Sequence, residues 1–228
     1  METLFLIVFF LLALSFIKIT FLLVYFKEEI DAAMKKDPAA RSFWEILFLY
    51  PGFHALVSHR ISHYFYQRKL FFIARLISQF SRWQTGIEIH PGATIGKGLF
   101  IDHGMGVVVG ETAVIGDDVL LYQGCTLGGT GLEKGKRHPT IGSNVVVGTG
   151  AKVLGDIIVG DNSYIGANAV VIKDVPPNST VVGVPGRITR QDGRKLDIML
   201  DHAHVLDPIV QSIEELQKKI EKLEDQAK

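Results

Sequence analysis

Histidines, a basic cluster and a single cysteine are the side chains of this chain whose types could carry chemistry. Arg137 and His138 lie in the segment GGTGLEKGKRHP, whose glycines and charges are typical of a mobile loop that contacts a substrate. His59 and His63 are four residues apart, as two metal ligands on one helix face would be, but no carboxylate motif lies between them, which favours a structural role. Cys125 falls inside a run of regularly spaced aliphatic residues, and this favours a core position over a nucleophile.

The composition excludes several classes of protein. The chain has 228 residues, and its 24 basic and 24 acidic side chains cancel, so it lacks the basic surplus of a nucleic-acid-binding protein. Hydrophobic residues make up 47% and charged residues 21%, a balance that excludes an intrinsically disordered chain. A single cysteine excludes an internal disulfide framework and a cysteine-rich zinc site, and it fits a reducing compartment. We therefore predict one or two folded domains and no nucleic-acid partner.

Residues 4–26 form a long apolar stretch, LFLIVFFLLALSFIKITFLLVYF. A helix of this length reaches roughly 35 Å, against about 30 Å for the hydrocarbon core of a bilayer. Lysines follow the stretch and none precedes it, a bias that places the remaining chain in the cytoplasm. We therefore predict that the apolar segment 1–26 tethers a cytoplasmic body to the inner face of a membrane. The alternatives are a buried core helix, a helix packed in an oligomer and a helix lying on the membrane, and Lys18 within the span counts against a membrane helix.

Residues 27–85 mix apolar and charged positions at helical spacing and are predicted to form a helical domain. Asp37-Pro38 indicates a helix start, because Asp caps a first turn and Pro fits inside it. Pro51-Gly52 interrupts the pattern, and the runs 53–65 and 70–83 are each predicted to be a helix.

An aliphatic residue recurs every six positions between residues 89 and 171. The series slips by two residues before Val109 and has a gap of 14 before Ile141; its members are Ile89, Ile95, Ile101, Val109, Ile115, Leu121, Leu127, Ile141, Val147, Val153, Val159, Ile165 and Val171. Such a period predicts a parallel β-helix, in which three short strands close a triangular coil of about 18 residues with each aliphatic side chain pointing inward. Small or β-branched residues two positions earlier support the same stacking, and Cys125 occupies one of these positions.

An open stack of coils leaves unpaired backbone at both ends, so both ends need a cap. The helices before residue 83 are expected to cap one end, and the Pro-rich exit at 175–186 ends the other. The gap of 14 holds eight residues more than a regular repeat, which predicts a protruding loop at 128–139.

Strings of residues in this region resemble serine O-acetyltransferase, a member of the hexapeptide-repeat acyltransferase superfamily. They are GIEIHPGATIG at 86–96, FIDHGMGVVVGETAVIG at 100–116, TLGGTG at 126–131, GKRHPTIG at 135–142 and VVGVPGR at 181–187. The resemblance implies an α+β fold in which N-terminal helices precede a left-handed parallel β-helix at 86–190 and a C-terminal helix follows at 191–228. It also implies transfer of acetyl from acetyl-CoA to the hydroxyl of L-serine, the first step of cysteine biosynthesis, in the cytoplasm.

The resemblance assigns roles to individual residues. His103 in IDHG matches the catalytic histidine, and histidine suits a general base because it titrates near neutral pH. Glu88 matches the carboxylate that pairs with this histidine, where many members carry Asp. Asp37 and Asp102 match the acidic groups that hold the ammonium group of serine.

Further roles fall on the predicted loop and its surroundings. Arg137 and His138 match the residues that bind the carboxylate of serine and orient its hydroxyl. A backbone N–H near Gly129 is the expected oxyanion donor. Glu111 matches a recurrent family acid, with a direct role or a structural role at a corner.

Acetyl-CoA, a co-substrate, is the cofactor that the resemblance implies, and no metal is expected. Its pantetheine arm is expected in a groove between two subunits of a homotrimer or a dimer of trimers. The residues expected in the wall of this groove are Thr149, Ala167 and Lys173.

The tail repeats apolar residues at spacings of three and four from Leu206 to Leu223. This pattern predicts either a short coiled coil that joins chains or a helix folded back on the β-helix. The chain ends in Lys228, whereas certain family members end in an Ile that inserts into cysteine synthase, so we do not expect stable docking to that enzyme.

Three other functions compete with this interpretation. An O-acetyltransferase of the same fold could act on a sugar or a polysaccharide, although residues matched to both charges of an amino acid argue against it. A γ-type zinc carbonic anhydrase would use three histidines, and His90, His103 and His138 are present, but their spacing does not follow that family's pattern. A non-catalytic trimeric membrane scaffold would leave His103 without a role.

Overall fold

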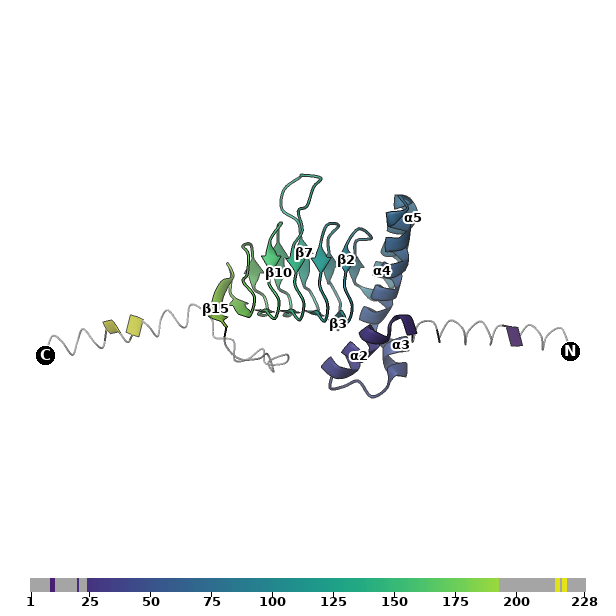
Figure 1. Ribbon diagram of the computed structural model, residues 1–228, viewed down its shortest axis with the longest axis horizontal. Coiled ribbons are helices and arrows are strands. Elements are labelled where there is room, and N and C mark those ends of the chain that lie inside the picture. Colours follow the sequence, from purple (N-terminus) through teal and green to yellow (C-terminus); the bar gives the residue numbers. More distant parts are fainter. Residues whose placement is uncertain (1–8, 11–19, 21–23, 193–215, 218, 221–228) are drawn as a thin grey trace.

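The computed structural model describes residues 9–10, 20, 24–192, 216–217 and 219–220. Four helices come first, and Figure 1 shows them gathered at one end of a stack of β-coils. They are α2 (Lys27–Lys36), α3 (Phe43–Leu49), α4 (Pro51–Gln67) and α5 (Phe71–Thr85). The last two confirm the predicted helices at 53–65 and 70–83, and Pro51 takes the first helical position, where its missing N–H costs nothing.

The predicted helix start at Asp37-Pro38 is wrong. Asp37 instead ends α2, with an extended backbone, because a residue before proline avoids the helical conformation. The next helix begins six residues later, where the Ser42 side chain accepts a hydrogen bond from the Glu45 backbone N–H.

Three parallel sheets form the faces of the β-helix. Sheet A contains β1 (Glu88–Ile89), β4 (Val108–Val109), β7 (Thr126–Gly128), β10 (Lys152–Leu154) and β13 (Val170–Val171). Sheet B contains β2 (Thr94–Ile95), β5 (Val114–Ile115), β8 (Thr140–Ile141) and β11 (Ile158–Val159). Sheet C contains β3 (Phe100–Asp102), β6 (Leu120–Tyr122), β9 (Val146–Val147), β12 (Tyr164–Ile165), β14 (Ser179–Val182) and β15 (Arg187–Gln191), and the last of these is antiparallel.

The register of sheet A reproduces the repeat read from the sequence. Val108 pairs with Thr126, 18 residues further on, which is one regular coil. Glu88 pairs with Val108 at a separation of 20, and Thr126 pairs with Lys152 at a separation of 26. The first coil is therefore longer by two residues and the third by eight, and Figure 1 shows the longer insertion as a loop that protrudes between β7 and β8.

The aliphatic series fills the interior of the coils, and each of its members is at most 6% exposed. Cys125 is fully buried among them, and its thiol donates to the carbonyl oxygens of Val147 and Gly148 at 3.3 and 3.1 Å. Burial raises the pKa of this thiol to about 11, so the thiolate needed for nucleophilic attack is scarce at neutral pH. The predicted core position of Cys125 is confirmed.

The helices cap the first coil through a buried ion pair. The Arg60 guanidinium on α4 donates to the carbonyl oxygens of Ile95 and Gly96, both at 2.6 Å, and lies 3.3 Å from the buried Glu29 carboxylate of α2. Carbonyl groups at the open end of the β-helix are thereby satisfied, as a cap requires.

Two predicted segments fall largely outside the described residues: the membrane helix at 4–26 and the helix of the C-terminal tail. Within the part of the chain that the structure describes, no helix combines the length and the apolar character needed to cross a bilayer.

Candidate active site

The corners that border sheet A form two edges of the triangular coil, and the predicted site residues of the β-helix lie along them. The C–A edge lies between sheets C and A, and the A–B edge lies between sheets A and B. The C–A edge comprises residues 103–107, 123–125, 148–151 and 166–169; the A–B edge comprises residues 90–93, 110–113, 129–139, 155–157 and 172–174.

His103 lies on the C–A edge, at the corner that is two residues longer than a regular one. Its φ of 58° and the φ of 72° at Gly104 place both residues in the left-handed region, which turns the chain sharply and lifts the histidine outward. The His103 side chain is 73% exposed, and its Nε2 lies 3.9 Å from Asp102 Oδ1. An exposed imidazole beside a carboxylate can accept a proton from a bound substrate.

A pair of carboxylates adjoins this histidine. Asp102 ends β3 next to Tyr122 of β6, and burial, followed by the nearby Asp37 charge, raises the pKa of Asp102, while His103 opposes that rise. Asp37 accepts hydrogen bonds on both oxygens, from the Tyr50 hydroxyl at 2.5 Å and from a backbone N–H. The pKa of Tyr122 rises to about 12 through burial and the same two carboxylates. The structure therefore brings Asp37, Asp102 and His103 together, and two neighbouring carboxylates can attract a cationic group.

Glu88 begins β1, one coil before His103, beside the same edge. Its backbone N–H donates to the Val107 carbonyl at 2.9 Å, so it lies next to the corner that carries the histidine. Its carboxylate lies 3.1 Å from Arg82 and 3.9 Å from Arg75, both on α5. These ion pairs anchor the carboxylate beside the C–A edge, and its predicted pairing with His103 stays a prediction.

Arg137 and His138 lie on the A–B edge, at the end of the protruding loop. His138 is only 8% exposed, and its Nδ1 accepts from the Thr112 backbone N–H at 3.2 Å. Burial, followed by the Arg137 charge, lowers the pKa of His138, so the ring is neutral at pH 7 and carries its proton on Nε2. A Cβ at Gly110 would lie 2.1 Å from Nε2, so glycine is needed for this ring to pack here. His138 is thus a hydrogen-bond donor rather than a base.

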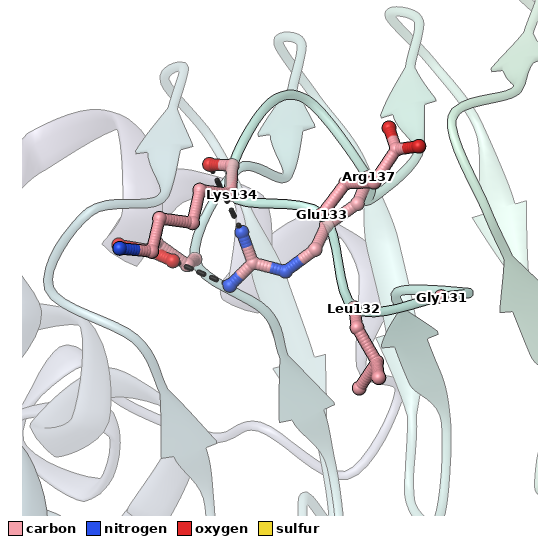
Figure 2. A pocket seen from close by; sticks show the side chains of 6 residues that line it. Gly131, Leu132, Glu133, Lys134 and Arg137 are labelled. Carbon is pink, nitrogen blue, oxygen red and sulfur yellow. Dashed lines mark hydrogen bonds and ion pairs between the residues drawn. The ribbon is translucent and has the colours of Figure 1, made fainter.

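A surface cavity of about 390 Å³ opens under the loop and is lined by Glu111, Gly131, Leu132, Glu133, Lys134 and Arg137. Figure 2 shows the Arg137 guanidinium with a dashed line to the Lys134 carbonyl, and the same guanidinium also pairs with the Glu111 carboxylate. The arginine lowers the pKa of Glu111, and the Tyr66 hydroxyl of α4 donates to Glu111 at 2.9 Å. The guanidinium can bind an anion here once one arrives.

The remaining predicted residues are divided between the two edges. Gly129 lies at the base of the loop on the A–B edge, where a Cβ would come within 3.1 Å of His138 Nε2. Lys173 is exposed on the same edge. Thr149 and Ala167 lie on the C–A edge, in neighbouring coils.

Three residues that contact the site were missed by the sequence analysis. Tyr50 holds Asp37, Tyr66 holds Glu111, and Thr112 holds His138. Thr112 could have been predicted from the sequence, because it adjoins Glu111 in the string GETA. The two tyrosines carried no signal, since each contacts a residue far away in the sequence.

The histidines of the competing zinc-enzyme hypothesis do not converge within one chain: His90 and His138 lie on the A–B edge, and His103 lies on the C–A edge. In the described part of the chain, no group of three or more His, Cys, Asp or Glu side chains is placed to hold a metal ion.

Comparison with known proteins agrees with this fold. The family model "Bacterial transferase hexapeptide (six repeats)" matches residues 138–173. The serine acetyltransferase of Bacillus pumilus is 58% identical over 197 residues, covering 86% of this chain and 91% of the relative. The crystal structure of the Neisseria gonorrhoeae serine acetyltransferase has a TM-score of 0.72 at 41% identity, over 74% of this chain and 64% of that longer chain. A structure of the same gonococcal protein in complex with serine has a TM-score of 0.70 at 41% identity, over 72% and 67% of the two chains.

Proposed function

This chain belongs to the serine acetyltransferase family, and from that premise we propose that it transfers acetyl from acetyl-CoA to the hydroxyl of L-serine, releasing O-acetyl-L-serine and CoA. One observation carries the proposal: the exposed imidazole of His103 adjoins a pair of carboxylates, Asp37 and Asp102. This arrangement suits a substrate that presents an ammonium group next to a hydroxyl that must lose its proton.

The proposed step is a direct attack without a covalent enzyme intermediate. His103 Nε2, which faces Asp102, takes the proton of the serine hydroxyl while the oxygen attacks the thioester carbonyl. The tetrahedral intermediate then collapses, the carbon–sulfur bond breaks, and the proton on His103 passes to the departing thiolate of CoA. Glu88 is proposed to orient His103 and to stabilise its charged form, and a backbone N–H near Gly129 is proposed to bind the oxyanion.

The substrate is proposed to bridge two poles. The ammonium group lies between Asp37 and Asp102, and the carboxylate pairs with Arg137, whose guanidinium lines the cavity under the loop and exchanges Glu111 for the substrate. The Nε2–H of His138 donates to an oxygen of the substrate, which is consistent with the neutral ring and the fixed tautomer.

These two poles lie on different edges of one protomer, and we propose that the working site forms between two copies of the chain. Contact between two different edges is heterologous, and such contacts close into a ring when the rotation between copies is a whole fraction of a turn. Both edges border sheet A, so a ring of three with sheet A facing the axis joins every C–A edge to a neighbouring A–B edge. Thr149 and Ala167 on one copy and Lys173 on the next would then form opposite walls of one groove for acetyl-CoA.

Helix α5 offers further support for assembly around this axis. It packs against β1 of sheet A, and large apolar side chains lie exposed along it: Phe72, Leu76, Phe80 and Trp83. A ring of copies would remove this apolar surface from water.

Mixing two inactive variants tests the shared site. We expect co-expressed His103→Ala and Arg137→Ala chains to recover about a quarter of the wild-type activity. In a random ring, about one contact in four joins an intact C–A edge to an intact A–B edge. Each variant alone stays inactive. Absence of recovery from mixed rings would place the whole site in one protomer.

The activity itself is tested by CoA thiol release from acetyl-CoA by the full chain, with L-serine, with sugar acceptors and without an acceptor. We expect release that depends on serine. Release with sugars alone would contradict the assignment of serine as the substrate.

The membrane anchor at 4–26 remains a proposal that rests on the apolar sequence alone. Sedimentation of the full chain with membranes, resisting high salt but released by detergent, is the expected result. Recovery of the full chain in the supernatant would contradict the anchor.

A further inference from the structure

We propose that Tyr50 is a positioning residue for the part of the site that binds the ammonium group, formed by Asp37 and Asp102. Its hydroxyl holds the Asp37 carboxylate toward Asp102 and thereby sets the affinity for L-serine. The proposal rests on the proposed function and adds to it a residue that the sequence motifs do not contain.

The geometry is that of a carboxylate held from two sides. The Tyr50 hydroxyl donates to Asp37 Oδ2 at 2.5 Å, and the Ala39 backbone N–H donates to Oδ1 at 2.7 Å. Each oxygen therefore keeps a free lone pair on a defined side, which a substrate ammonium group can use.

Asp37 needs such support because its backbone is irregular. It ends α2 and is followed by a connection without helix or strand that runs to Ser42. Tyr50, by contrast, is well anchored: it immediately precedes α4, and its ring packs against Phe100 of β3 with centroids 6.4 Å apart. Since β3 also carries Asp102, the tyrosine ties Asp37 to the same strand as the second carboxylate.

The chemistry of the donor matters as much as its position. A lysine or arginine at this point would neutralise Asp37 and compete with the substrate ammonium. A neutral hydroxyl stabilises the carboxylate but leaves its charge in place. Burial and the neighbouring Asp37 raise the pKa of Tyr50 far above its ordinary value, so the hydroxyl remains a donor throughout the working pH range.

The test is Tyr50→Phe in the full-length chain, which keeps the ring against Phe100 and removes only the donor. We expect the KM for L-serine to rise about tenfold, as for loss of a hydrogen bond to a charged group, with kcat and the KM for acetyl-CoA changed less than about twofold. Tyr64→Phe is the matched control, because Tyr64 lies on α4, the helix that Tyr50 precedes, is exposed and has its ring beneath Arg68.

A double-mutant cycle separates positioning from general packing. In an Asp37→Ala background, Tyr50→Phe should leave the KM for L-serine unchanged, because the group that the hydroxyl holds is absent. An equal rise in both backgrounds, or an equal rise in the KM for acetyl-CoA, would overturn the proposal in favour of a structural role.

The outcomes also distinguish this inference from the proposed function. A wild-type enzyme that depends on serine, together with an unaltered Tyr50→Phe variant, would overturn the role of Tyr50 alone. A wild-type chain that releases no CoA with serine would overturn both.

Discussion

The C–A edge and the A–B edge carry the same types of residue but differ in how exposed the histidine is and in whether the charges are compensated. On the C–A edge His103 is exposed, and the nearby Asp37 carboxylate is held by neutral donors, so its charge stays uncompensated. On the A–B edge His138 is buried and neutral, and the Arg137 charge is already compensated by Glu111. The first edge is therefore prepared for a cation and a proton, whereas the second must exchange an internal ion pair for a substrate anion.

The two histidines show how burial alone decides a role. The His103 side chain is 73% exposed and open to a substrate, while the His138 ring is buried and bonded through Nδ1, which leaves its Nε2–H as a donor. The family resemblance assigned different roles to the two histidines, but residue type alone could not, because both are histidines next to a charged residue.

The largest expected effect is that of His103→Ala. Removal of the base should lower kcat by a factor of about 10² to 10⁴, with L-serine binding retained, because the pair of carboxylates is untouched. Stopped-time thiol assays and calorimetric titration with L-serine measure the two quantities. A loss of activity smaller than tenfold would contradict the role of His103 as the base, which is what distinguishes the C–A edge from the A–B edge.

Gly110→Ala tests the other edge without changing a polar group. The added Cβ would lie 1.9 Å from the His138 ring, which must then leave its place beside Thr112. We expect kcat/KM for L-serine to fall about tenfold to a hundredfold, because misplacing a substrate-orienting group by about 1 Å can cost up to about a hundredfold in rate. Gly135→Ala is the control. Gly135 lies in the same protruding loop as His138, and a Cβ there would meet nothing within 4 Å. Equal effects of the two substitutions would contradict a positional role for His138.

The burial of histidines near the A–B edge also predicts a pH dependence of stability. His59 is buried on α4, and burial lowers its pKa from 6.5 to about 3. The unfolded chain takes up this proton below about pH 6.5 and the folded chain does not, so stability should fall with decreasing pH by about 1.4 kcal/mol per unit.

Denaturant unfolding between pH 7 and pH 4.5 measures this slope, and His59→Gln should reduce it by about 1.4 kcal/mol per unit, leaving the part that His90 and His138 contribute. Ser62→Ala provides the control: Ser62 is buried on the same helix but does not titrate, so its loss should shift the whole curve in parallel. An unchanged slope in the His59 variant would show that the acid sensitivity arises elsewhere.

The period of six allowed most of the β-helix to be predicted. Every member of the six-residue series from Ile89 to Val171 lies inside, because a side chain in a regular coil has only two directions and the repeat fixes which one. The same count located the long corner at His103 and the loop before Ile141. It could also have assigned residues to edges, since position within the coil follows from the spacing alone.

Contacts between the helices and the coils could not be predicted in this way. The sequence analysis proposed Asp37 both as a site residue and as the start of a helix, and the second prediction was wrong. Asp37 follows α2, and its side chain accepts from Tyr50 instead of capping a first helical turn. The Arg82 and Arg75 partners of Glu88 likewise come from α5, and no repeat relates a helix to the strand that it covers.

The smallest expected effect comes from Tyr66→Phe, the counterpart of Tyr50→Phe. Both hydroxyls donate to a site carboxylate from α4 or its N-cap, Tyr50 to Asp37 and Tyr66 to Glu111. Asp37 meets the substrate directly in the proposed complex, whereas Glu111 acts through Arg137, which already compensates its charge and holds its position. We therefore expect the KM for L-serine to rise only about twofold, within the range of a partly exposed neutral donor. If Tyr66→Phe raised the KM for L-serine as much as Tyr50→Phe does, the A–B edge would be as rigid before binding as the C–A edge. The loop would then not rearrange when the substrate binds.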